Sequence, residues 1–335
     1  MPVPLIPVLL GVIAVTTGAV GVHKGHKAIK TNRKANDINE NAQDIIDTAQ
    51  YKLQIARDKT TRALSDLGNK KIDICDKHLA RFVSCFEKLK NVELEASIGL
   101  DELAKFKIDK QAITDLKKVT LLATSLATGT AGGALVGAVT AFGAYGAAGA
   151  LATASTGTAI ASLSGVAATN ATLAFFGGGA IAAGGLGVAG GTMVLGGIVA
   201  GPALAVTGIV MDAKASRNLD NARSNLAKAQ EVKAELAVLT TACNGIKRRA
   251  DLYTKTLIKL ESILNMQLAK VEYIIATEGV DYATFGKNSK DQVAMLLGTV
   301  QAIKALLDTP LLNEDGGLTA ESKQVVTAIK GLLDA

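Results

Sequence analysis

The sequence predicts an all-α fold in which a long antiparallel helical bundle, or coiled coil, encloses a Gly/Ala-rich hydrophobic membrane hairpin. Residues 119–211 contain no Asp, Glu, Lys, Arg or His. On both sides of this charge-free run, apolar residues recur at alternating spacings of four and three, which is the heptad pattern of paired helices. No segment of the sequence shows the alternation of apolar and polar residues that is typical of a strand.

These observations divide the 335 residues into four parts. We expect a hydrophobic N-terminal helix over 1–22, an N-terminal helical flank over 23–118, a membrane-inserting glycine-zipper region over 119–211 and a C-terminal helical flank over 212–335. Lys and Arg exceed Asp and Glu by 20 to 15 before the charge-free run and by 16 to 15 after it. This mildly basic N-terminal flank suits an anionic lipid surface, and no basic cluster has the form of a nucleic-acid motif, so we expect no nucleic-acid partner.

Residues 2–22 are uncharged, contain three prolines near their start and are long enough to span a membrane. Basic residues such as Lys24 and Lys27 follow this stretch, whereas no Lys or Arg precedes it. The positive-inside rule then predicts an uncleaved segment with its N-terminus outside and its C-terminal side in the cytoplasm, with these two lysines at the interface. The alternative is a peripheral hydrophobic helix that docks on the rest of the protein.

The N-terminal flank carries a heptad pattern that predicts two long antiparallel helices. The first begins at the polar residues 35–39 and ends at the stop signal Gly68-Asn69, and the second extends from 72 to about 95. The expected core positions of the first helix are Ala42, Ile46, Ala49, Leu53, Ala56, Thr60, Ala63 and Leu67.

The charge-free run is long enough for two to four membrane spans, and 21 of its residues are Gly and 25 are Ala. Small residues spaced by four let helix backbones touch in lipid. Three such faces are formed by Gly129, Gly133 and Gly137, by Gly187 and Gly191, and by Gly197 and Gly201. We expect a turn at Asn170, a helix start before Phe175 and Phe176, and a kink at Pro202. The alternatives are a buried helical hairpin in a soluble bundle and a disordered low-complexity segment, and the low hydrophobicity per residue favours conditional insertion.

Basic residues mark both ends of the charge-free run. A short helical segment, 99–118, ends with Lys117 and Lys118, while Lys214 and Arg217 follow the run. We expect these four side chains at a water interface on one side of the membrane, which implies an even number of crossings.

The C-terminal flank repeats the heptad pattern. It predicts one helix over 215–246, interrupted at Lys233, and a second over 257–275 after Arg248-Arg249. A further helix carries Val293, Leu296, Val300, Ile303 and Leu307 at its core positions, and a last short helix begins at Thr319. Each flank would thus supply a pair of long helices to a bundle that closes over the charge-free run.

Few residues suggest chemistry. Residues 185–190 match the dinucleotide-binding pattern G-x-G-x-x-G, but no strand precedes them, so we reject this interpretation. The chain has three His and three Cys, and Cys75 and His78 are spaced by three. We expect Cys75 in the core rather than in a metal site, a reducing compartment, and no catalytic, cofactor-binding or metal-ligating residues.

The chain resembles bacterial helical glycine-zipper proteins, on the spaced glycines Gly187, Gly191, Gly197 and Gly201. More loosely, its paired amphipathic helices around an apolar Gly/Ala hairpin resemble the apolipoprotein L family and helical pore-forming toxins. These resemblances imply a soluble or peripheral bundle that opens, inserts its hairpin and oligomerises, and they supply no catalytic residue.

The functional hypothesis is a membrane-inserting helical protein that oligomerises to form a pore or to permeabilise a bilayer. The alternative is a membrane-anchored scaffold that shapes or tethers bilayers without a pore, and an enzyme ranks third because no acid, base or nucleophile stands out. The expected partners are a lipid bilayer and further copies of the chain, with no cofactor. The expected location is a membrane, either the bacterial inner membrane or one reached from a soluble cytoplasmic form.

Overall fold

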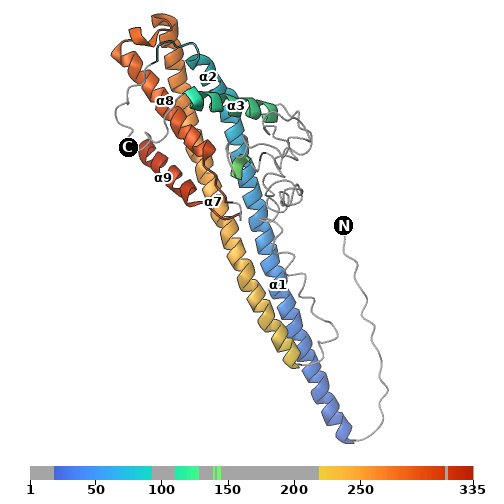
Figure 1. The fold of residues 1–335 in the computed structure, drawn as a ribbon. Helices are drawn as coiled ribbons and strands as arrows, with labels where there is room; N and C mark the ends of the chain where they lie inside the picture. Colours follow the sequence, from blue (N-terminus) through green and yellow to red (C-terminus); the bar gives the residue numbers. More distant parts are fainter. Residues whose placement is uncertain are drawn as a thin grey trace. The chain divides into compact units, whose positions relative to one another are not determined.

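The computed structural model describes residues 19–92, 110–127, 139, 142–144, 219–313 and 316–334. These residues are mostly helical and contain no strand, which confirms the all-α class. In chain order the elements are α1 (Ala19–Asp73), the π-helix η1 (Ile74–Leu79), α2 (Ala80–Phe86), α3 (Lys110–Ala127), α7 (Leu219–Glu278), the 3-10 helix η5 (Tyr282–Thr284), α8 (Lys287–Asp308) and α9 (Ala320–Asp334) (Figure 1).

The described chain falls into two compact units. The first contains α1 up to residue 49 and α7 up to residue 235. Small and apolar side chains of both helices are buried there, including Ala35, Ala42, Ile46, Ala222, Ala229 and Val232. Asn225 Nδ2 donates a hydrogen bond to Asn39 Oδ1 at 3.0 Å, so these two helix segments pack as a pair.

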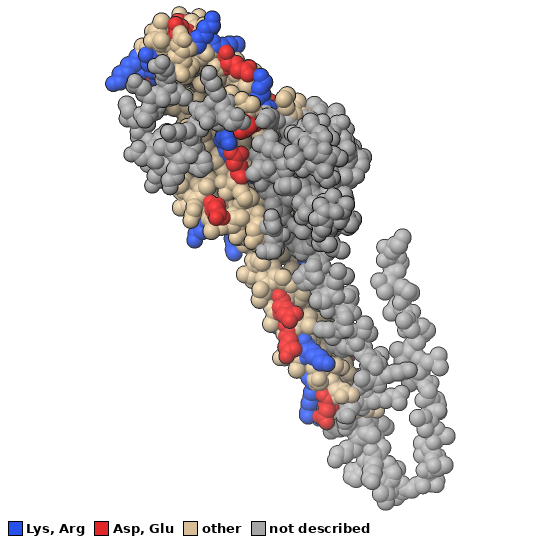
Figure 2. Space-filling view, in the orientation of Figure 1, with Lys and Arg blue, Asp and Glu red and all other residues tan. Residues whose placement is uncertain are grey.

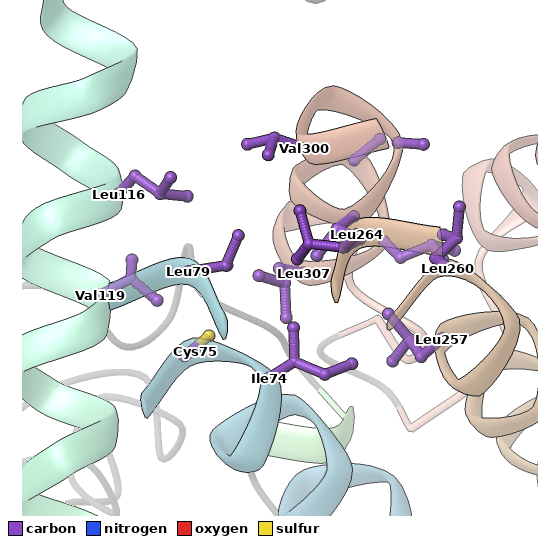
Figure 3. Packing of buried hydrophobic residues seen from close by; sticks show 14 of the residues in the cluster. Ile74, Cys75, Leu79, Leu116, Val119, Leu257, Leu260, Leu264, Val300 and Leu307 are labelled. Atoms are coloured by element: carbon purple, nitrogen blue, oxygen red, sulfur yellow. The ribbon is translucent and has the colours of Figure 1, made fainter. Parts of the chain in front are cut away.

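The second unit contains the remaining described residues and the main hydrophobic core. Figure 3 shows how the core is built: Leu79 lies between Leu116 of α3 and Leu307 of α8. The neighbouring residues Ile74 and Cys75 are both fully buried; Ile74 lies toward Leu257 and Leu307, and Cys75 lies on the side of α3 (Figure 3). Adjacent residues of the π-helical turn η1 are thus buried in different parts of the core.

The predicted core positions are confirmed. All eight positions of the first expected helix, from Ala42 to Leu67, are buried, and so are all five positions of α8. Cys75 lies in the core, as expected. The last helix, α9, also appears where the sequence predicts it.

The predicted helix boundaries inside the flanks are wrong. α1 is already helical at Ala19, well before the expected start at 35–39, and it continues through Gly68-Asn69 instead of ending there. α7 is one helix of 60 residues that passes Arg248-Arg249 without a break. All five prolines lie at positions 2, 4, 7, 202 and 310, so none interrupts either helix.

The core face of α7 explains why that helix continues. Val232 is buried beside the exposed Lys233, so the expected interruption does not occur. Ala250 and Tyr253 are fully buried and connect the two predicted helices into one face. The charged Arg249 is accommodated beside this face, because its Nη1 donates a hydrogen bond to Ser322 Oγ at 3.2 Å.

The expected pair of antiparallel helices within the N-terminal flank is also wrong, because the two long helices α1 and α7 pair across the flanks and run parallel. Thr60 Oγ1 donates to the carbonyl of Cys243 at 2.8 Å, and Lys70 Nζ donates to Glu261 at 3.0 Å. Further along, Arg81 binds Glu272 at 2.5 Å. The partner's number rises with the residue's number, so α7 runs in the direction of α1 (Figure 1). A long crossover connection is what permits parallel neighbours in a helical bundle, and the charge-free run lies in that connection.

Three shorter helices complete the second unit. α8 turns back along α7, with Ser289 Oγ donating to Glu278 near the turn. α9 packs on α7 through the Tyr253 hydroxyl, which donates to the carbonyl of Ser322 at 3.1 Å. α3 extends nine residues into the charge-free run, beyond the expected boundary between 118 and 119.

No helix among the described residues is both long and apolar enough to cross a membrane. The expected membrane hairpin falls mostly on residues outside the described ranges. The described part of the charge-free run comprises residues 119–127, 139 and 142–144.

Candidate functional site

The candidate site is the place where residues 139 and 142–144, called here the docked segment, contact the bundle. They are helical residues of the charge-free run, far in sequence from the helices that they touch. Val139, Phe142 and Ala144 are buried in the same core cluster as α1, α7 and α8. The site therefore joins the charge-free run to the bundle.

Two glycines make the contact possible. A Cβ atom added to Gly68 of α1 would lie 1.9 Å from the carbonyl oxygen of Val139, and one added to Gly143 would lie 2.1 Å from that of Leu64. Real Cβ atoms do not approach other atoms so closely, so each glycine allows one backbone to lie directly on the other. Gly68 is therefore a packing residue inside a helix, although glycine costs a helix about 1 kcal/mol relative to alanine.

Lys71 lies one helical turn after Gly68 and is fully buried. Its Nζ donates to the carbonyl oxygens of Phe142 and Gly143, both at 3.4 Å, and lies 5.9 Å from the centroid of the Phe142 ring. Burial lowers the pKa of Lys71 to about 8, although the nearby Cys75 and Asp308 act in the opposite direction. The ammonium group is thus held by weak, long hydrogen bonds in an environment that disfavours its charge.

The loop after α8 holds the other end of the docked segment. The carbonyl oxygen of Ala144 accepts hydrogen bonds from the backbone N–H groups of Leu311 at 2.7 Å and Leu312 at 3.1 Å. Leu311 and Leu312 are buried, and the Thr319 N–H donates to the carbonyl of Leu311 at 3.1 Å. This loop is therefore fixed to the start of α9 while it binds the docked segment.

α3 enters the bundle by a different kind of contact. Its residues Leu116, Val119 and Ala123 are buried against the core. Its exposed side carries polar contacts to the neighbouring elements: Lys117 Nζ lies 2.8 Å from Glu87, and Thr124 Oγ1 donates to Asp76 of η1.

Burial raises the pKa of the Cys75 thiol to about 12, so this thiol is neutral at physiological pH.

Most of the predicted site residues lie outside the described ranges: Gly129, Gly133, Gly137, Asn170, Phe175, Phe176, Gly187, Gly191, Gly197, Gly201, Pro202, Lys214 and Arg217. Lys24 and Lys27 fall within α1, and Lys118 falls within α3. Lys117 is the one predicted site residue whose side chain is described, and it is half exposed in the ion pair with Glu87.

The residues that form the site were not predicted from the sequence. Gly68 was interpreted as a helix stop, and Lys71 is part of a Lys-Lys pair that resembles a solvated surface. The available signal was a glycine inside an otherwise regular heptad face, since such a residue usually has a packing reason. No signal of that kind marks Gly143, because the charge-free run contains many other glycines.

The arrangement is suited to holding a segment of chain, because it combines backbone contacts, two N–H donors and one buried amine. Over the described ranges, no group of three or more His, Cys, Asp or Glu side chains could hold a metal ion. Comparison of the chain with protein-family models, with curated proteins and with solved structures finds no match.

Proposed function

We propose that this is a membrane-inserting helical protein, whose charge-free run enters a lipid bilayer and oligomerises with other copies to form a pore or to permeabilise the bilayer. The observation that carries the proposal is the length of residues 119–211, 93 residues without a charged side chain. A single charge at the centre of a bilayer is costly, and a stretch of this length without one suits lipid as a solvent. The small-residue faces at Gly129, Gly133 and Gly137 would let helices of the inserted state pack closely.

The described bundle would remain in water during this process. Lys and Arg are mixed with Asp and Glu over the described part of the face in Figure 2. Such a surface is typical of a soluble helical bundle, and the apolar side chains of α1, α7 and α8 are mostly used in its own core. Insertion would then depend on residues of the charge-free run and, at the interface, on the basic residues Lys24, Lys27, Lys117, Lys118, Lys214 and Arg217.

Insertion would be conditional. Val119, Ala123 and Phe142 of the charge-free run are buried against protein, whereas Leu121 of the same run is 66% exposed. A Gly/Ala-rich segment loses less than a Leu-rich one when it stays folded in water, since it has less apolar area to bury. A water-soluble state and a membrane-bound state are therefore both compatible with the same sequence.

A second function is a membrane-anchored helical scaffold that shapes or tethers bilayers without a pore. The firm apolar packing of α3, through Leu116 and Val119, favours this alternative, because it keeps the start of the charge-free run attached to the bundle. An enzymatic function ranks third, and we expect no catalytic activity.

Leakage from dye-loaded anionic liposomes tests the first proposal. We expect the purified protein to release the dye, and failure to release it at any pH or protein concentration would contradict the proposal. The double variant Gly133→Leu with Gly137→Leu separates the two functions, because bulky side chains prevent close helix packing in lipid. A pore should lose leakage in this variant, whereas an anchor should still sediment with the vesicles.

A further inference from the structure

We infer that the docked segment, residues 139 and 142–144, is a releasable latch that holds the charge-free run on the bundle and that must open before the run enters lipid. This inference rests on the proposed function. It concerns the regulation of insertion rather than insertion itself.

The contacts of the latch are of a kind that can be broken without unfolding the helices that they join. On the bundle side they involve the backbone of α1 at Leu64 and Gly68 and the two N–H groups of Leu311 and Leu312. None of these groups is needed to hold α1 against α7, which pair through their own side chains. Opening the latch would therefore leave the bundle intact.

The buried amine of Lys71 destabilises the docked state. Lys71 points its charge at two carbonyl oxygens at 3.4 Å, which is long for a charge-assisted hydrogen bond. When the docked segment departs, that ammonium regains water. The structure thus places a group that prefers water beneath the segment that covers it, and this preference opposes the apolar contacts of Val139 and Phe142.

The glycine pair gives a direct way to open the latch by substitution. Gly68→Ala adds a methyl group that would collide with the carbonyl of Val139, at 1.9 Å, while it favours the helical state of α1. Gly245→Ala is the matched control, because Gly245 is also inside a helix and its added methyl would meet Leu318 at an ordinary 3.6 Å. Both variants exchange a helical glycine for alanine, and they differ in the collision.

Hydrogen exchange at the Leu311 and Leu312 amides reports latch opening without any membrane, because both donate to Ala144 in the docked state. We expect Gly68→Ala to raise exchange at these amides by about 10-fold, since overpacking a tight contact typically shifts an equilibrium by a factor of about 5 to 150. We expect leakage from anionic liposomes to accelerate in the same variant, and Gly245→Ala to match the wild type in both measurements. If Gly68→Ala does not fold, Gly143→Ala replaces it. This variant places the methyl on the charge-free run instead of on α1, 2.1 Å from the carbonyl oxygen of Leu64, and it should give the same result.

Two outcomes would overturn the latch. In one, exchange at Leu311 and Leu312 stays at the wild-type rate in both collision variants. In the other, exchange accelerates but leakage does not, although the wild-type protein permeabilises the liposomes. A third outcome separates the proposed function from the latch. If exchange shows that the segment opens, but neither the wild type nor any variant binds vesicles or causes leakage, the proposed membrane function is wrong. The latch then cannot regulate insertion.

Discussion

The paired helices α1 and α7 and the docked segment are held by different physical means. Along α1 and α7, apolar side chains such as Leu67 and Leu264 are buried at regular heptad positions. In the docked segment the glycine pair brings two backbones together, and a buried Lys71 faces carbonyl oxygens. Burial of large apolar side chains contributes most to stability in a folded protein, whereas a buried charge with long hydrogen bonds opposes it.

This difference separates two roles in the molecule. The heptad core keeps the bundle folded, and the glycine contact is the place where, in the proposed latch, one segment is released. A weak attachment is useful in a protein that would exchange between water and lipid, because elements that move come from the least stable part of a structure. The following predictions test whether the two regions respond as differently as their contacts indicate.

The largest effect is expected in the heptad core. Leu264→Ala removes a fully buried side chain that lies among Leu257, Leu260 and Leu307 (Figure 3), and it should lower the free energy of unfolding by about 4 kcal/mol. Urea denaturation followed by circular dichroism at 222 nm measures this change. The control Met266→Ala alters the same helix at a side chain that is 54% exposed, and it should change stability by no more than about 0.5 kcal/mol. Equal losses in the two variants would mean that the heptad face does not carry the stability.

The heptad core is also the part of the fold that the sequence predicts best. Periodicity identifies which side of a helix is buried, so residues such as Ala42 and Val300 could be placed in the core. It does not identify the partner helix or its direction, because a parallel and an antiparallel neighbour bury the same positions. For that reason the pairing of α1 with α7 was missed, although the core positions were correct.

The docked segment could not be predicted in the same way. Its backbone contacts depend on the absence of a side chain at Gly68 and Gly143, which leaves no hydrophobic period in the sequence. Its buried residues Val139 and Phe142 lie in a run that is uncharged throughout, so no period marks them either. Lys71 follows another lysine in the sequence, and its complete burial depends on neighbours that are distant in sequence, among them Phe142 and Asp308. Long-range backbone contacts of this kind become visible only when the chain is folded.

The second prediction concerns Lys71. Because burial lowers its pKa from 10.5 to about 8, the folded state binds this proton less tightly than the unfolded state does. The free energy of unfolding therefore rises with pH, by about 1.4 kcal/mol for each unit between about 8 and 10.5, and is constant with respect to this group below that window. The groups that face the amine are the thiol of Cys75 and the carboxylate of Asp308, and burial raises the pKa of that thiol to about 12, above this window.

Lys71→Met provides the measurement. The variant removes the charge and keeps the length of the side chain, so at pH 7 it should unfold at a higher urea concentration than the wild type. The difference should shrink as the pH rises toward 10.5, since the wild-type amine then becomes neutral. The effect of pH on all other groups is common to both proteins and cancels in the comparison. A difference that does not depend on pH, or a less stable variant at pH 7, would contradict a destabilising buried charge.

The smallest effect is expected at Lys117 of α3, which lies two residues before the charge-free run. Its ion pair with Glu87 is half exposed, with 53% and 50% of the two side chains accessible, so Lys117→Ala should cost less than about 1 kcal/mol and nothing measurable at high salt. The apolar side chains of Leu116 and Val119 then keep α3 in place. The expected role of Lys117 at a lipid interface predicts a separate loss, of about 1 kcal/mol, in binding to anionic but not neutral vesicles.

Lys259→Ala is the matched control for that binding measurement, because Lys259 is also exposed and paired, with Asp334, but lies on α7, far in sequence from the start of the charge-free run. A loss of vesicle binding in Lys117→Ala alone would place lipid at the end of the bundle where the charge-free run begins. Equal losses in both variants would mean that the anionic surface attracts the basic residues of the bundle as a whole. Binding would then depend on the number of lysines and not on their position, and it would not indicate where the run meets the bilayer.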